Sequence, residues 1–353
     1  MRSASRLLVL LLPALTGCRT LYVLRSAWFE AELLSSREPI DRVLAEGRIE
    51  GPRADRLRLV PEIRAFADEL GLASTRSYTS VALSWDRRIL NLSACAPLSF
   101  QVATWWFPVV GRVPYLGFFR PQDAEAERVR WEARGYDVWV RPAGAFSTLG
   151  WFRDPVLPEM LDWDEARLAE TLLHETAHAT LWIPGSVSFN ETFATVVGEA
   201  ASLIWMERVH GPDAPGVARL EADRADGRAF EALLLDLYDD LDVVYKNLDE
   251  SPAARWEARR ALYDSLEDRV ARASWNDPDR ARAAARRGPW NNARLAQYRT
   301  YHLARDGFDV LLARAGGDIS AFVDAVRQVV DGARDPWKAL AAATETAVPL
   351  SDR

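Results

Sequence analysis

Five consecutive residues, His174-Glu175-Thr176-Ala177-His178, form the pattern H-E-x-x-H. On an α-helix, residues four apart differ by about 40° of rotation and about 6 Å of rise, so both imidazoles can reach one ion. Neutral histidine nitrogens bind Zn²⁺, and a neighbouring carboxylate can take the proton of an attacking water. With four histidines in the chain, chance predicts only about 0.004 such matches. The pattern therefore predicts one Zn²⁺ per chain, with His174 and His178 as ligands and Glu175 as the catalytic base.

The flanking sequence predicts the helix that this pattern needs. Asp162 and Asp164 can cap its N-terminus. Its apolar face would consist of Leu168, Leu172, Leu173 and Ala177. Neither proline nor glycine follows until Pro184-Gly185, where we expect the chain to break before a second helix.

A catalytic zinc has three protein ligands and a water, so a third ligand is expected close by. Ser188 is a candidate N-cap of the second helix, which would carry Glu191 in its first turns. Glu191 is the preferred third ligand. Asn190, next to it, is expected to support the ligand residues without binding the metal itself. Glu199 lies eight residues later on nearly the same face. Glu199 could accept an imidazole N–H, could itself be the third ligand, or could belong with Glu191 to a polar helix face.

A peptidase also needs a donor for the oxyanion that develops on the substrate carbonyl. The best cluster in the C-terminal part consists of Asn291, Asn292, Tyr298, Tyr301 and His302. Tyr301 and His302 are the candidates for this catalytic role. The alternative for each is aromatic packing on a C-terminal helix.

The N-terminus has the pattern of an export signal. Arg2 and Arg6 precede an apolar run, and Leu15-Thr16-Gly17-Cys18 follows it. This resembles the lipobox of bacterial lipoproteins, which implies a leader at 1–17 and lipidation of Cys18; an ordinary cleaved signal peptide is the alternative. Arg19, where retained lipoproteins carry aspartate, favours the periplasmic face of the outer membrane. The net charge of −7 argues against a nucleic-acid partner.

Hydrophobic periodicity predicts an α+β fold that is mainly helical, with a small mixed β-sheet. We expect one metallopeptidase domain over 18–353, helical at 19–75, β-rich at 77–152 and helical again at 162–345. In the β-rich part, a hairpin is expected around Asp86-Arg87-Arg88, and Tyr136-Asp137-Val138-Trp139-Val140 is expected to be a strand. Residues 145–152 would form an extended edge of the cleft.

The H-E-x-x-H pattern followed by Asn190-Glu191-x-Phe193-Ala194 resembles the gluzincin metallopeptidases, which implies a gluzincin-like core with Glu191 as third ligand. The spacer of twelve residues before Glu191 is shorter than in thermolysin-like enzymes. A closer resemblance is to a bacterial family of predicted aminopeptidases, many of them lipoproteins. The segments that carry it are EPI (38–40), FPVVG (107–111), YLGFF (115–119), AFSTLGWFRDP (145–155) and NNARL (291–295).

These patterns together predict an envelope lipoprotein that hydrolyses peptide bonds with zinc, as an aminopeptidase acting on peptide or protein substrates. Three alternatives stay open. They are a zinc endopeptidase, an amide hydrolase of cell-wall fragments, and a lipoprotein with a non-catalytic zinc site. Thiolate ligands would favour the last, and no cysteine lies near the pattern in sequence.

Overall fold

The computed structural model describes residues 18–107, 111–143, 153–302 and 304–347. The N-terminal helices are α2 (Cys18–Ser35), α3 (Ile40–Ala45) and α4 (Gly51–Glu69). The strands are β1 (Glu38–Pro39), β2 (Ser80–Val81), β3 (Leu90–Cys95), β4 (Trp105–Phe107), β5 (Gly111–Val113), β6 (Leu116–Phe118) and β7 (Asp137–Pro142), with α5 (Pro121–Glu132) before β7. The mainly helical α+β class is as predicted.

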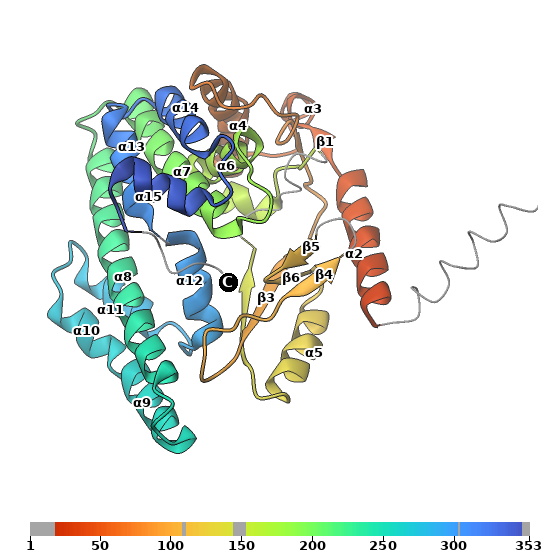
Figure 1. Ribbon diagram of the computed structural model, residues 1–353. Helices are drawn as coiled ribbons and strands as arrows, with labels where there is room; N and C mark the ends of the chain where they lie inside the picture. The colour runs from red at the N-terminus through yellow and green to blue at the C-terminus, as the bar shows by residue number, and fades with distance from the viewer. Residues whose placement is uncertain (1–17, 108–110, 144–152, 303, 348–353) are drawn as a thin grey trace, which may run out of the picture.

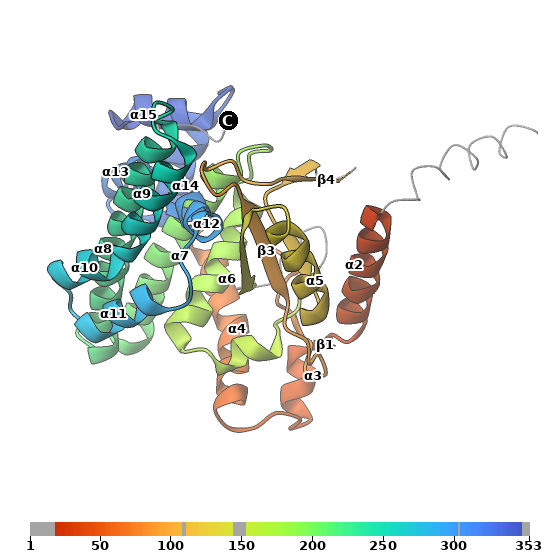
Figure 2. The same ribbon diagram turned by 90° about the horizontal axis from the view of Figure 1, so that it is seen from below.

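Helices make up the rest of the described chain. They are the 3₁₀ helix η2 (Pro158–Asp162), α6 (Glu165–Thr180), α7 (Val187–His210), α8 (Pro215–Lys246), α9 (Pro252–Asp264), α10 (Leu266–Arg272), α11 (Pro278–Arg286), α12 (Asn292–His302), α13 (Arg305–Arg314), α14 (Ile319–Val330) and α15 (Pro336–Thr344). Figures 1 and 2 show α6 and α7 side by side near the centre of the molecule, with α13, α14 and α15 against them.

The sheets are antiparallel rather than mixed. The largest has the strand order β6-β3-β7, while β1 pairs with β2 and β4 pairs with β5. Among the described residues, the single parallel contact is an isolated bridge between Val81 and Val156. The predicted strand at 136–140 is confirmed as β7, one residue later at its start.

The hairpin predicted around Asp86-Arg87-Arg88 is wrong. β2 pairs with β1, and β3 pairs with β6 and β7. The hairpin does not form because side chains before and within the expected turn contact other parts of the fold. Trp85 is buried against Phe119, and Arg87 binds Glu32 on α2 at 2.9 Å. These contacts hold the segment as a connection between sheets.

The three-stranded sheet has two different faces. Leu92, Leu116 and Val138 point to the same side and form a small core with Ala124 and Trp131 of α5. Because side chains alternate along a strand, Asn91, Ser93, Tyr115, Gly117, Trp139 and Arg141 belong to the opposite face. On that face Ser93 lies 3.1 Å from Gln297 of α12. The polar face of the sheet is thus turned towards the C-terminal helices.

The main core surrounds α6 and α7. It joins side chains from Leu33 to Leu340, so helices from both ends of the chain share it. Phe189 of α7, for example, lies against Phe308 of α13 and Trp337 of α15, with ring centroids 4.9 and 5.1 Å apart. This packing fixes the helix pair that carries the predicted zinc ligands. A second core joins buried side chains of α8, α10, α11 and α12.

Candidate metal centre

The H-E-x-x-H residues lie on α6, as predicted. Asp164 caps this helix, and its carboxylate accepts a hydrogen bond from the Arg167 N–H at 2.8 Å. Asp162, the other predicted cap, instead binds Arg53. His178 is buried and His174 half-buried, and their Nε2 atoms lie 3.1 Å apart. The two imidazoles therefore converge on one point, as the spacing requires.

Glu191 approaches the same point from α7. The chain turns at Pro184-Gly185, where Gly185 has a φ of +82°, and α7 begins at Val187. Glu191 lies in the first turns of that helix, and its Oε2 is 3.5 Å from the Nε2 of both histidines. The structure thus brings together the three residues predicted to bind the metal.

Asn190 holds the loop that joins the two helices. Its side-chain oxygen accepts from the Ile183 N–H at 2.9 Å, and its side-chain nitrogen donates to the Ile183 carbonyl at 2.8 Å. The prediction of Ser188 as N-cap is wrong, because the cap position is Ser186. Ser188 is buried inside the first turn, where its hydroxyl lies 3.3 Å from the Trp337 indole nitrogen. The helix therefore begins two residues earlier than a cap at Ser188 would place it.

These three side chains fit a zinc ion. Each offers one ligand atom, and the three atoms lie within 4.8 Å of one another. Ligand atoms in a tetrahedral zinc site are roughly 3.3 Å apart, since each is about 2.0–2.1 Å from the ion. The distances of 3.1 and 3.5 Å match that spacing. Two imidazole nitrogens and one carboxylate are also a donor set typical of catalytic zinc.

Electrostatics tie the cluster together. Burial opposes charge on both Glu191 and His174, yet hydrogen bonds from the two imidazoles lower the pKa of Glu191. Burial alone would lower the pKa of His174, but its hydrogen bond with Glu191 and the charges of Glu175 and Glu191 raise that pKa above its ordinary value. A buried carboxylate that stays ionised is a good metal ligand.

Glu175 lies beside the three ligand residues and is not one of them. Its Oε2 is buried and has no hydrogen-bond partner among the described residues. A buried acceptor without a donor destabilises the fold, so its presence calls for an explanation such as a catalytic role. This free acceptor suits the predicted role of Glu175 as a base that receives a proton.

Two tyrosines near Glu175 had been given no role by the sequence. The pKa of Tyr78 is raised well above its usual value by burial and then by the charges of Glu175 and Asp154. Tyr78 also has a φ of +59°, which is unusual for a bulky residue, and its buried hydroxyl has no partner among the described residues. Burial and the charge of Glu191 raise the pKa of Tyr115 to about 12. Only three-dimensional proximity distinguishes these two from other tyrosines.

Two further acidic residues, one on each helix of the pair, form ion pairs with arginines. Glu199 of α7 binds Arg305 of α13 at 2.7 Å, and both side chains are mostly buried. Glu170 of α6 binds Arg224 of α8 at 3.3 Å. The role predicted for Glu199 beside an imidazole stays a prediction, and its carboxylate already has a charged partner.

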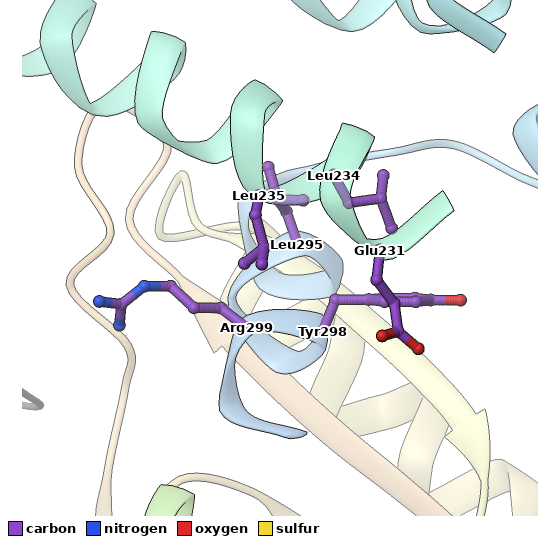
Figure 3. Close-up of a pocket in the computed structure, with 6 residues that line it drawn as sticks. All are labelled: Glu231, Leu234, Leu235, Leu295, Tyr298 and Arg299. Carbon is purple, nitrogen blue, oxygen red and sulfur yellow. The ribbon is translucent and has the colours of Figure 1, made fainter. Parts of the chain in front are cut away.

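The C-terminal cluster is mostly structural where it is described. Asn292 is buried and accepts hydrogen bonds from the hydroxyls of Tyr245 and Tyr263. Tyr298 lies in a narrow crevice between α8 and α12, beside Glu231, Leu234, Leu235, Leu295 and Arg299 (Figure 3). Tyr301 and His302 are in the last turn of α12, but their side chains lie outside the described residues. Their predicted role is therefore untested.

Two other predictions also fall outside the described part of the chain. Residues 145–152, predicted as a cleft edge, are not described, and neither is the side chain of Cys18, although α2 begins at this residue.

Cys95 is buried and free, and its pKa is raised by burial. Within the described residues, every helix is too short or too polar to cross a membrane.

Comparison with known proteins gives one match. The model of a protein family described as "Putative aminopeptidase" matches residues 21–339, which is most of the chain. No curated protein and no solved structure matches it.

Proposed function

Since the chain belongs to the "Putative aminopeptidase" family, we propose that it is a zinc-dependent peptidase whose centre is formed by α6 and α7. The family suggests peptidase activity. The observation that carries the zinc dependence is the convergence of His174, His178 and Glu191 on one point at ligand spacing. Glu175, with a buried and unpartnered carboxylate oxygen, stands beside that point.

In this proposal His174, His178 and Glu191 hold the ion. When bound, Zn²⁺ would polarise the substrate carbonyl and stabilise the negative charge that develops on its oxygen. Glu175 takes a proton from the attacking water while the water oxygen bonds to the carbonyl carbon. The carboxylic acid so formed gives that proton to the amide nitrogen as the C–N bond breaks. The products are a carboxylic acid and an amine, the acid then passes its proton to the amine, and Glu175 is again ionised.

A hydroxyl donor for the oxyanion is available at Tyr115. Its pKa of about 12 keeps the hydroxyl protonated at neutral pH, so it can donate a hydrogen bond. Burial, and then the charges of Glu191 and Glu175, raise the pKa of this hydroxyl. Tyr115 thus joins Tyr301 and His302 as a candidate for this role.

We place the enzyme in the bacterial cell envelope, anchored by lipid at Cys18 on the periplasmic face of the outer membrane. The support is the sequence Leu15-Thr16-Gly17-Cys18 together with the character of α2, which begins at that cysteine. Val23, Leu24 and Trp28 on this helix are exposed, and Trp28 is 71% exposed. Apolar side chains next to an acylated residue would suit a lipid surface.

The experiment that tests the proposed chemistry is Glu175→Gln in the zinc-loaded protein. This variant should keep about one zinc per chain and lose hydrolysis of peptide substrates by orders of magnitude, because the base is lost and the ligands are not. Glu207→Gln, the same change further along α7, is the matched control and should leave both properties unchanged. Activity that survives in Glu175→Gln, or in wild type fully stripped of metal, would refute the proposal.

The same assay separates two kinds of peptidase. An aminopeptidase should cleave peptides with a free N-terminus and fail on their N-acetylated forms. Equal cleavage of both forms would instead identify an endopeptidase.

A further inference from the structure

A cavity lies between α2 and α5, on the apolar face of the three-stranded sheet. Its volume is about 600 Å³, within the roughly 300–1,000 Å³ usual for sites that bind small ligands. Leu116 and Phe118 of β6 line it, and both belong to the sheet face that packs against α5. Figures 1 and 2 show the two helices on the side of the molecule away from α8. The described residues that line the cavity include none of the metal centre.

The floor of the cavity is aromatic. Trp105, Phe118 and Phe119 line it and are buried. On the side of α2, Phe29 lies against Phe119 with ring centroids 5.6 Å apart. On the side of α5, Trp131 lies against Trp105 with ring centroids 5.3 Å apart. The inner part of a ligand must therefore be apolar, because a polar group placed among these rings would lose its hydrogen bonds to water.

The mouth of the cavity runs along α5 and carries two arginines. The exposed residues of the lining are Ala126, Arg130 and Arg134, at intervals of four along the chain. Arg130 binds Glu127 at 3.1 Å. The guanidinium carbon of Arg134 lies 5.1 Å from the ring centroid of Trp131, and Arg134 forms no ion pair with another described residue. A cation without a carboxylate partner thus stands where the aromatic floor meets solvent.

The charge and the length of the lining fit an anionic chain molecule. Two of its three arginines have carboxylate partners within the lining, and Arg134 is the one that does not. On α5 the lining extends from Asp123 to Trp131, eight residues later, or about 12 Å of helix. On α2 it extends from Tyr22 to Phe29, seven residues later, or about 10 Å. A cavity that follows two helices lengthwise, with its surplus positive charge at one end, suits a long apolar chain that has one anionic end.

We propose that this cavity binds a long-chain fatty acid, with its carboxylate beside Arg134 and its acyl chain on the aromatic floor. A free fatty acid fits better than a phospholipid, because the cavity has room for one acyl chain and its mouth has one unpaired positive charge. This site is separate from the proposed peptidase centre and does not depend on it.

The test is calorimetric titration of the full-length, zinc-loaded protein, as wild type and as Cys18→Ser, with fatty acids below their micelle concentrations. Myristate should bind both proteins at one site per chain. Laurate has two CH₂ groups fewer and should bind roughly tenfold more weakly, because less apolar surface is buried. Tetradecanol has the chain of myristate without its charge and should bind about 2- to 5-fold more weakly than myristate. Equal affinities for laurate and myristate would overturn the proposal.

Variants with matched controls locate the bound acid. Ala126→Trp places an indole in the mouth of the cavity at an exposed position, so the protein should fold and bind myristate at least tenfold more weakly. Ala225→Trp, at an exposed position of α8, should bind it as wild type does. Arg134→Gln should remove the preference for myristate over tetradecanol. Arg128→Gln, on α5 but outside the lining, should keep that preference.

Three other outcomes would contradict the proposal. Undiminished binding of myristate to Ala126→Trp, with thermal unfolding like that of wild type, would place the acid elsewhere, for example at the zinc ion. A preference for myristate over tetradecanol that survives in Arg134→Gln would overturn the position of the carboxylate. Binding to Cys18→Ser but not to wild type would mean that a lipid attached to the chain itself fills the cavity, which overturns a free ligand.

Discussion

Gly198 of α7 lies against the backbone of α6, and replacing it with alanine should force the two ligand-bearing helices apart. A Cβ at this position would lie 2.9 Å from the carbonyl oxygen of Glu170 and 3.1 Å from the Cβ of His174. Ordinary contacts begin at 3.4 Å, and the nearest obstacle is backbone, which cannot rotate away. The helices must therefore separate by about half an ångström.

The energetic cost can be estimated with a matched control. Overpacking of this kind costs about 1–3 kcal/mol, whereas alanine for glycine inside a helix gains about 1 kcal/mol. Gly227 lies inside α8, and a Cβ there would meet nothing within 4 Å. Gly227→Ala should therefore gain the helix propensity without the clash. The free energy of unfolding should be about 1–3 kcal/mol lower for Gly198→Ala than for Gly227→Ala.

Metal affinity should change with the helix separation. The backbone nitrogen and Cβ of His174 are both among the atoms that the added methyl group would press, so its imidazole would move relative to Glu191. Since ligands must be held within about 0.5 Å, we expect the zinc affinity to fall on the order of tenfold or more. Denaturant unfolding and zinc titration against a competing chelator measure the two effects. If Gly198→Ala matches Gly227→Ala in stability and wild type in zinc affinity, the reasoning is refuted.

Two other predictions concern the third ligand and the anchor. Glu191→Gln should weaken zinc retention about as severely as His178→Ala, while Glu199→Gln should be milder, on the order of 10- to 100-fold, in dialysis against graded chelator. The reverse order would exchange the two roles, and no effect of either would place the third ligand elsewhere, with His302 the next candidate. Metabolic labelling with a palmitate analogue should tag wild type and not Cys18→Ser; recovery of both in the soluble periplasmic fraction would contradict lipidation.

Local patterns in the sequence were sufficient to predict α6. Its cap at Asp164, its apolar face and its uninterrupted run to Thr180 all depend on neighbouring residues. The break at Pro184-Gly185 and the approach of Glu191 to both histidines also follow, because a short connection between two helices leaves few ways to pack them. The helical character of the N-terminal part was predictable for the same reason, since Ile63, Phe66 and Leu70 repeat at helical spacing.

Contacts between distant segments could not be predicted in the same way. The Asp-Arg-Arg segment had the composition of a hairpin turn, but the contact of Arg87 with Glu32, 55 residues away, decides its conformation. The partners of Glu170 and Glu199 are arginines on α8 and α13, and no spacing rule connects them. In the sequence, Tyr115 stood out only as a residue of the YLGFF segment that carries the family resemblance. The effect of the Glu191 charge on its pKa depends on how the sheet packs against the helices.

The ion pairs around α6 and α7 show which carboxylates of this helix pair have an arginine partner and which have none. Glu170 and Glu199 each have an arginine, so their charges are balanced within the protein. Among the described residues, no arginine or lysine forms an ion pair with Glu175 or Glu191. Two neighbouring carboxylates that have only imidazoles and no arginine or lysine beside them repel each other, and one divalent cation would balance both. The negative charges of Glu175 and Glu191 are thus the ones that a bound cation would neutralise. This charge argument supports the proposed zinc site independently of the ligand spacing.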